Sequence, residues 1–318
     1  MIYHVYATKS NIGDWLSAKG IQALLEPVEV HELFCDSPCV EETLSVLSRL
    51  TPQDFIIIGG GGLLMDYFEG FWEGFRSIAD RAPFALWGVG CCDLKRENTS
   101  VSKELMTDIV RRSRLCVVRD QLTWEFVSSR SLPDPVPCPS LSVIERREGP
   151  GRGLLHAVHA GIVDPETHQE ICGIVRELAE KSGRPYRETR NRIEPKARNL
   201  QLELEKYRNS DVVISSRLHG CIIAVGMGKK LIALSGDRKI DHFMDSAGLK
   251  EWVVEMDDIG RLPEMLVCIE EQENPRAFVD RVRQDNLLVS EKIKSLIEDA
   301  KRAPHHRTEG SPVATKSY

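Results

Sequence analysis

Short, almost entirely apolar runs alternate along this chain with longer segments whose apolar residues recur at helical spacing. In the first half the runs lie at 2–7, 55–58, 84–87 and 115–118, and the helical patterns lie at 14–25, 66–80 and 102–113. Runs that are apolar at every position are typical of strands buried on both faces of a parallel sheet. Their alternation with helices of this length predicts βαβ units, and therefore a doubly wound α/β fold.

A stretch rich in proline and glycine, at 131–153, interrupts this pattern and indicates a connection between domains. A second alternation follows it, with strands expected at 154–159, 211–215 and 230–234 and a long amphipathic helix at 276–301. We therefore predict two Rossmann-like doubly wound domains. Their expected boundaries are 1–140 for the N-terminal domain, 141–275 for the C-terminal domain, 276–302 for a C-terminal helix and 303–318 for a disordered tail.

The densest group of reactive side chains, Ser215-Ser216-Arg217-Leu218-His219-Gly220, follows the predicted strand at 211–215 and opens a helix. Ligands of open α/β sheets bind at the carboxyl ends of strands. An arginine at a helix N-terminus favours an anion, and a histidine transfers protons near neutral pH. Lys239 follows the next strand, which places it on the same rim of a parallel sheet. The competing interpretation of His219 is structural, as a side chain that only satisfies a carbonyl group.

Three loops of the first half also follow strands. In Asn11-Ile12-Gly13-Asp14, Asp14 is either the N-cap of the next helix or a group that accepts a proton or holds a sugar hydroxyl. Gly59 to Gly62 permit close backbone approach, either to a ligand or to neighbouring structure, and match neither G-x-G-x-x-G nor the P-loop. Arg119 either pairs with Asp120 or reaches into the cleft as a second anion clamp.

Composition narrows the class of protein. The chain has 318 residues and a net charge of −6, which indicates no nucleic-acid partner. No run approaches the ~20 apolar residues of a membrane helix. Nine cysteines without a CxxC pair predict reduced thiols and a cytoplasmic location. No cluster of His, Asp and Glu has metal-ligand spacing, so we expect no metal and no cofactor.

These motifs together resemble the polysaccharide pyruvyl transferase family. The resemblance spans roughly residues 8–250 and rests on Asn11-x-Gly13-Asp14, Gly59 to Gly62, Arg119-Asp120, Ser216-Arg217-Leu218-His219-Gly220, Asp237 and Lys239-Ile240. It implies a GT-B-like fold in which the two domains face each other across a cleft. It also implies transfer of the pyruvyl unit of phosphoenolpyruvate to a sugar, with formation of a ketal and release of phosphate, in polysaccharide biosynthesis such as that of an exopolysaccharide. Gly228-Lys229-Lys230 departs from the Gly-x-Pro common in the family.

The resemblance also implies roles for single residues. Arg119, Arg217 and Lys239 would hold the phosphate and carboxylate of phosphoenolpyruvate, His219 would donate a proton, and Asp14 would be a base or orient a hydroxyl. Further substrate contacts are expected from Ser216, Asn11, Gly60, Gly61 and Gly62. The acceptor would be a sugar of a lipid-linked or nucleotide-linked glycan precursor, reached by transient association with membrane-bound glycan machinery. The alternatives are a GT-B-like glycosyltransferase that uses a nucleotide sugar and a non-catalytic glycan-binding relative.

Overall fold

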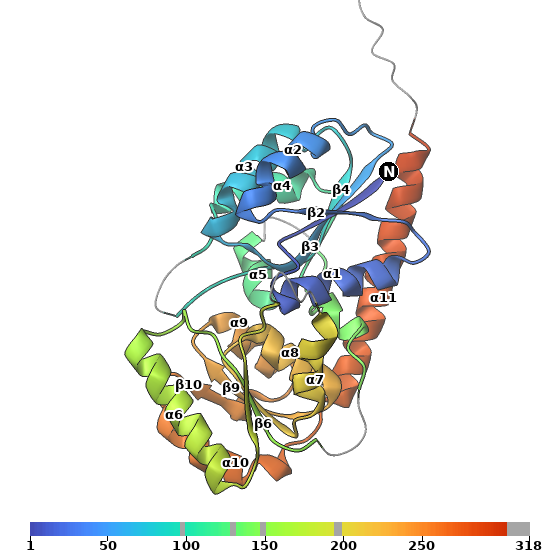
Figure 1. Ribbon diagram of the computed structural model, residues 1–318. Coiled ribbons are helices and arrows are strands. Elements are labelled where there is room, and N and C mark those ends of the chain that lie inside the picture. The colour runs from blue at the N-terminus through green and yellow to red at the C-terminus, as the bar shows by residue number, and fades with distance from the viewer. Residues whose placement is uncertain (96–98, 128–131, 147–150, 194–198, 304–318) are drawn as a thin grey trace, which may run out of the picture.

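Two parallel five-stranded sheets, one from each half of the chain, form the framework of the protein (Figure 1). The computed structural model describes residues 1–95, 99–127, 132–146, 151–193 and 199–303. The first sheet has the order β2-β1-β3-β4-β5, with β1 (Ile2–Tyr6), β2 (His31–Phe34), β3 (Phe55–Leu64), β4 (Phe84–Cys91) and β5 (Leu115–Val118). The second has the order β10-β9-β8-β6-β7, with β6 (Leu154–Ala157), β7 (Tyr186–Thr189), β8 (Val212–Ser215), β9 (Lys230–Ser235) and β10 (Val253–Glu255).

The two sheets share one topology. When the strands of each sheet are numbered along the chain, both sheets have the order 2-1-3-4-5, read from one edge to the other, and the paired strands are parallel. This order reverses between the first and third strands, where doubly wound sheets bind their ligands. The predicted pair of doubly wound α/β sheets is therefore confirmed. The boundaries at 140 and 275 stay predictions, and residues 304–318 of the expected tail lie outside the described residues.

Helices cover both faces of the first sheet. Helices α1 (Ile12–Leu25) and α11 (Arg276–Lys301) pack on one face, and α2 (Val40–Leu47), α3 (Glu69–Ile78), α4 (Lys103–Arg112) and α5 (Gln121–Val127) pack on the other. In β3, Phe55 and Ile57 join the cluster under α1 and α11, whereas Ile56 and Ile58 join the cluster under α3 and α4. Because successive side chains of a strand point to opposite faces, burial of both faces requires an unbroken apolar run.

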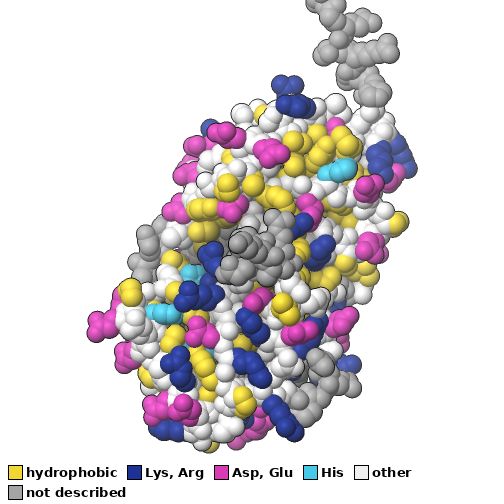
Figure 2. Space-filling model, in the orientation of Figure 1, with side chains coloured by type: hydrophobic (Ala, Val, Ile, Leu, Met, Phe, Trp, Pro, Cys, Tyr) yellow, Lys and Arg dark blue, Asp and Glu magenta, His cyan; other side chains and the backbone are white. Residues whose placement is uncertain are grey.

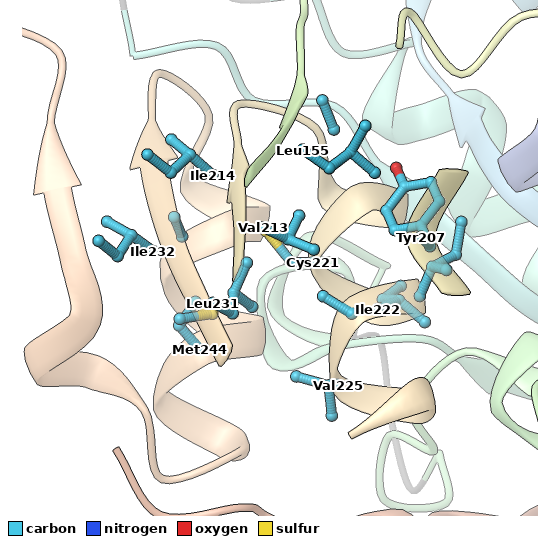
Figure 3. Packing of buried hydrophobic residues seen from close by; sticks show 14 of the residues in the cluster. Leu155, Tyr207, Val213, Ile214, Cys221, Ile222, Val225, Leu231, Ile232 and Met244 are labelled. Carbon is cyan, nitrogen blue, oxygen red and sulfur yellow. The ribbon is translucent and has the colours of Figure 1, made fainter. Parts of the chain in front are cut away.

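The second sheet carries α6 (Pro165–Lys181), α7 (Leu200–Arg208), α8 (Leu218–Met227), α9 (Arg238–Ser246) and α10 (Leu262–Val267). Helix α8 is apolar around its whole circumference, which is typical of a buried helix. Figure 3 shows its Cys221 and Ile222 beside Val213 of β8, and they belong to one buried cluster. The helix ends at Gly228, whose φ of 72° gives a left-handed C-cap, a conformation that favours glycine.

Helix α11 connects the two halves of the molecule (Figure 1). Its first turns place Val282 in the core of the second sheet, and its last turns place Ile293 on the first sheet. Between them lies Asn286, whose side chain donates a hydrogen bond to the carbonyl of Pro137 (2.9 Å) and accepts one from Trp87 Nε1 (3.1 Å). The helix predicted at 276–301 is confirmed, and it belongs to both cores.

Two segments differ from the sequence-based prediction. The arginine-rich sequence of residues 184–198 suits a solvated loop or a substrate-facing flap, but residues 186–189 form β7, an edge strand whose polar and charged side chains suit the border of a sheet, and 194–198 lie outside the described residues. The glycines at 59–62 were expected to follow a strand, but β3 continues through them to Leu64. None of the helices within the described ranges is both long and apolar enough to span a bilayer.

Candidate functional site

A cavity of about 420 Å³ lies between the carboxyl ends of the two sheets. It is bordered by Ser10, Met65, His159 and Arg217, which follow β1, β3, β6 and β8 respectively. These are the strands that flank the reversal of strand order in each sheet, so the cavity lies at the switch points of both. Figure 2 shows Lys, Arg and His side chains gathered near the junction of the two halves.

Main-chain hydrogen bonds join the two halves near the cavity. On the α1 side, Ile12 N donates to Asn191 O (3.0 Å) and Ile193 N donates to Ser10 O (2.7 Å). At α9, Arg238 N donates to Asp93 O (3.0 Å). The walls of the cavity are thereby held in a defined relation to each other.

Arg217 occupies the N-cap position of α8 and borders the cavity. Its backbone N–H donates to Ser215 Oγ (3.1 Å), and its Nε donates to the carbonyl of Val158 (2.6 Å). Within the described part of the chain its guanidinium has no carboxylate partner. Burial, and next the positive charge of Arg192, lower its pKa to about 10. A bound anion would offset both effects, because charge-assisted hydrogen bonds are strongest where water is excluded.

Two further cations reach the same cavity. Lys239 Nζ pairs with Asp237 Oδ2 (2.5 Å) and contacts Cys92 Sγ (3.0 Å). Arg119, which is 4% exposed, pairs through Nε with Asp120 Oδ2 (3.1 Å) and still borders the cavity. Arg119 is therefore both the partner of Asp120 and a residue of the cavity, and its role as an anion clamp stays a prediction.

Three helices begin at this cavity. Asn11, Leu218 and Lys239 border it from the first residues or N-caps of α1, α8 and α9. A helix N-terminus carries a partial positive charge and free N–H groups. The helix termini and the three cations thus add to one positive potential.

His219 lies in the first turn of α8, partly buried, and borders the cavity. Its Nε2 lies 3.1 Å from Oγ of the buried Ser17 and 3.6 Å from Cys138 Sγ. Burial, followed by the charges of Arg119, Lys239 and Arg217, lowers its pKa to about 3. Near neutral pH the imidazole is therefore uncharged unless an anion offsets these cations. The predicted role of His219 as proton donor stays a prediction.

Asp14 is not the N-cap of α1, so that interpretation is wrong. The cap is Asn11, whose Oδ1 accepts a hydrogen bond from Gly13 N (3.0 Å), and Asp14 follows in the first turn. Asp14 is 9% exposed and borders the cavity. Burial raises its pKa to about 7, against the lowering effect of Arg119 and Lys239.

The glycines of the motifs make room for helix α1 and for side chains of the site. A Cβ at Gly61 (φ 111°) would lie 2.4 Å from Asp14 Oδ1, and one at Gly60 (φ 83°) would lie 2.9 Å from Ser17 Cβ. A Cβ at Gly13 would lie 2.1 Å from His219 Nδ1. Of the three glycines predicted to contact substrate, the structure brings Gly62 to the cavity and packs Gly60 and Gly61 against α1.

Ser216 is also placed differently from the expectation of a substrate contact. Its hydroxyl accepts a hydrogen bond from His159 N (2.8 Å), and the residue is buried and does not border the cavity. This hydrogen bond joins the loop after β6 to the loop after β8, so Ser216 helps to position the loops that border the cavity.

The family model described as polysaccharide pyruvyl transferase matches residues 11–238. The chain belongs to the polysaccharide pyruvyl transferase family. The family assignment made from the sequence is thus confirmed, and the match contains every residue predicted for the site from the sequence except Lys239. A comparison with curated proteins finds no match.

Solved structures show the fold of this family member. MnaA of S. aureus, solved with UDP, has a TM-score of 0.57 at 9% identity, covering 94% of this chain and 96% of that one. UDP-GlcNAc 2-epimerases of Methanocaldococcus jannaschii and Neisseria meningitidis have TM-scores of 0.55 and 0.53 at 9% and 12% identity. The comparisons cover 91% and 94% of this chain and 99% of each neighbour. Identities this low show the fold alone, which is GT-B, as predicted.

Two residues of the pyruvyl transferase cavity were not named as site candidates from the sequence. His159 follows an apolar segment that is typical of core or edge placement, but it borders the cavity, and burial followed by the charge of Arg217 lowers its pKa to about 4. Arg192 lies in the stretch that suited either a solvated loop or a substrate-facing flap, and it borders the cavity and forms a bridge with Asn11. His159 follows β6, at the reversal of strand order, and Arg192 follows β7, at the edge of the sheet. These positions can be recognised only once the strand order is known.

Throughout the described ranges, no group of three or more His, Cys, Asp or Glu side chains is placed to hold a metal ion.

Proposed function

We propose that this protein transfers the pyruvyl unit of phosphoenolpyruvate to a sugar of a glycan or glycan precursor, with formation of a ketal and release of phosphate. The observation that carries the proposal is the convergence of Arg119, Arg217 and Lys239 with three helix N-termini on one cavity. Phosphoenolpyruvate presents a phosphate and a carboxylate close together. A site with several separate cations matches that charge distribution.

The cavity also holds the two proton carriers that the reaction needs. Ketal formation requires a proton at the methylene carbon of phosphoenolpyruvate and removal of protons from two sugar hydroxyls. Asp14 and His219 border the cavity from opposite halves of the molecule. Positioned acids and bases of this kind contribute about 10²–10⁴-fold to a rate.

The acceptor side of the proposal concerns the first half of the molecule. Thr8, Ser10 and Asp36 border the part of the cavity formed by the loops after β1 and β2, and Tyr67 lies beside them with 54% of its surface exposed. Hydroxyl, carboxylate and aromatic groups suit a sugar ring. We assign the acceptor to a lipid-linked or nucleotide-linked precursor, used in the cytoplasm by transient association with membrane-bound machinery.

The proposal is tested by incubating the protein with phosphoenolpyruvate and either a UDP-sugar or a lipid-linked glycan. We expect acceptor-dependent release of phosphate. Mass spectrometry should show a pyruvyl mass gain on the acceptor, and NMR should show the methyl group that distinguishes a ketal from an isomeric enolpyruvyl ether. Release of UDP without consumption of phosphoenolpyruvate would instead establish a glycosyltransferase.

Single-residue variants distinguish an enzyme from a protein that binds glycans without catalysing a reaction. His219→Ala should lower the rate at least about 10²-fold, in the range of a lost proton-transfer group. His168→Ala is the matched control, because His168 lies on α6 and does not border the cavity. If neither variant changes any activity or glycan binding, the protein is a non-catalytic relative.

A further inference from the structure

The cavity contains an apparent contradiction, because a carboxylate lies inside a site built for an anion. Asp14 is only 9% exposed, and none of the described residues forms a hydrogen bond or ion pair with its carboxylate. It faces a cavity bordered by Arg119, Arg217 and Lys239. An ionised Asp14 would repel an incoming phosphate or carboxylate, whereas a protonated Asp14 would donate a hydrogen bond or a proton to it.

His219 has the opposite character. Its Nε2 is within hydrogen-bond distance of Ser17 Oγ, and Arg119, Arg217 and Lys239 all disfavour its charged form. A neutral imidazole is a competent base and a poor acid. The two proton carriers thus have environments that push their protonation states apart, which is how acid and base roles are separated in one site.

We propose that Asp14 is the acid that protonates the substrate and that neutral His219 is the base that accepts the proton of the attacking hydroxyl. This inference rests on the proposed function and reverses the roles that the resemblance implied for the two residues.

The proton balance closes over one turnover. The Asp14 carboxyl gives its proton to the methylene carbon, which becomes the methyl group, while the first sugar hydroxyl forms a bond to C2 and passes its proton to His219. The bond from C2 to the phosphate oxygen then breaks, and the departing phosphate takes the proton from His219. The second hydroxyl bonds to C2 and returns its proton to Asp14, so that both side chains regain their starting states.

The charged groups around Asp14 act in both directions. Burial is the largest influence and raises its pKa to about 7. Arg119 at the end of β5, Lys239 of α9 and Arg217 at α8 oppose this, and Asp36 after β2 reinforces it. Tyr6 of β1 and Cys35, next to Asp36, complete the titratable surroundings. A bound trianion would offset the cations and would raise the pKa values of both Asp14 and His219, which start from about 7 and about 3 respectively.

Calorimetry of phosphoenolpyruvate binding tests this without turnover. Titrations at about pH 8 in buffers of different ionisation enthalpy count the protons taken up on binding, and we expect up to about one in the wild type. Asp14→Asn should abolish the uptake and bind phosphoenolpyruvate at least as tightly. His219→Gln should keep the uptake. Asp36→Asn removes a neighbouring charge that raises the pKa of Asp14, so it should reduce the uptake without abolishing it.

The outcomes distinguish the inference from the proposed function. If the wild type does not bind phosphoenolpyruvate, the proposed function itself is wrong. If it binds but Asp14→Asn takes up the same number of protons, or if His219→Gln loses the uptake, the assignment of the acid is wrong and the pyruvyl transfer stands. Asp14→Asn should also lower kcat at least about 10²-fold without weakening phosphoenolpyruvate binding, a split that a merely structural role would not give.

Discussion

The two walls of the cavity are built from the same kind of strand–loop–helix unit but differ in their charges. The wall of the second sheet presents Arg217 and Lys239, each at the start of a helix and each fixed by a contact to its own half. The wall of the first sheet presents the buried carboxylate of Asp14 beside Arg119. An anion is therefore best held by the second sheet, and the acceptor is best placed on the first.

This division explains why the molecule needs both halves. Neither wall alone combines a cluster of cations with an acid. The hydrogen bonds from Ile12 N and Arg238 N across the junction, together with helix α11, hold the two walls in a fixed relative position. Changes to single residues on each wall should therefore have different signatures.

The largest effect is expected from the cationic wall. Arg217→Gln removes a desolvated positive charge, and loss of charge-assisted hydrogen bonds worth about 1.5–3 kcal/mol each should weaken phosphoenolpyruvate binding at least about 10²-fold. Binding by calorimetry and kcat/KM measure this. The control is Arg238→Gln, because the Arg238 side chain is 53% exposed and does not border the cavity. Equal losses in both variants would remove the distinction between the walls.

A smaller effect is expected where the walls touch. Gly13→Ala would place a methyl group 2.1 Å from His219 Nδ1, so α1 and His219 must separate. Overpacking of this kind costs about 1–3 kcal/mol of unfolding free energy and should also lower activity.

The matched control for Gly13 is Gly173→Ala in α6, where a Cβ meets nothing within 4 Å. This change should leave activity intact and stabilise the helix by up to about 1 kcal/mol. Denaturant unfolding of both variants measures the difference, and a harmless Gly13→Ala would mean that the contact between α1 and His219 is not tight.

The walls should also respond to pH with opposite signs. His219 has a pKa lowered from 6.5 to about 3, so its unfolded form binds more protons and stability is lost as pH falls below about 6.5. Asp14 has a pKa raised from 3.8 to about 7, so its contribution is present below about pH 4 and is lost as pH rises toward 7.

Each of these groups changes the unfolding free energy by at most about 1.4 kcal/mol per pH unit. Between about pH 4 and 6.5, Asp14→Asn should steepen the rise of stability with pH, and His219→Gln should flatten it. Urea unfolding at several pH values gives the slopes. Identical slopes in the two variants would contradict the opposite protonation states.

The smallest effect is expected from the ion pairs at the outer edge of the junction. Lys95 pairs with Asp241 (2.7 Å) and Glu255 (2.5 Å) of the second half, where the Glu255 side chain is half exposed. Lys95→Ala should cost about 1 kcal/mol or less, and the loss should shrink at high salt. A larger, salt-independent loss would show that the edge, and not the core of the junction, holds the walls together.

The sequence by itself determined the local elements and the chemistry at their ends. Apolar runs such as Phe55-Ile56-Ile57-Ile58 predict a strand buried on both faces, because each residue must face one hydrophobic layer or the other. The apolar circumference of α8 and its closing glycine follow in the same way. The position of Arg217 and His219 after a strand was equally readable, since it depends only on neighbours in the chain.

Only the tertiary structure decided which of these ends meet. His159 and Arg192 reach the cavity because β6 lies beside β8 and β7 lies beside β6, a strand order that local patterns do not encode. The same holds for Gly60 and Gly61, whose packing against α1 depends on how the helix crosses β3. The protonation of Asp14 and His219 depends on burial and on charges that include Arg119, which lies at least a hundred residues from both along the chain, because electrostatic forces act through space and not along the chain.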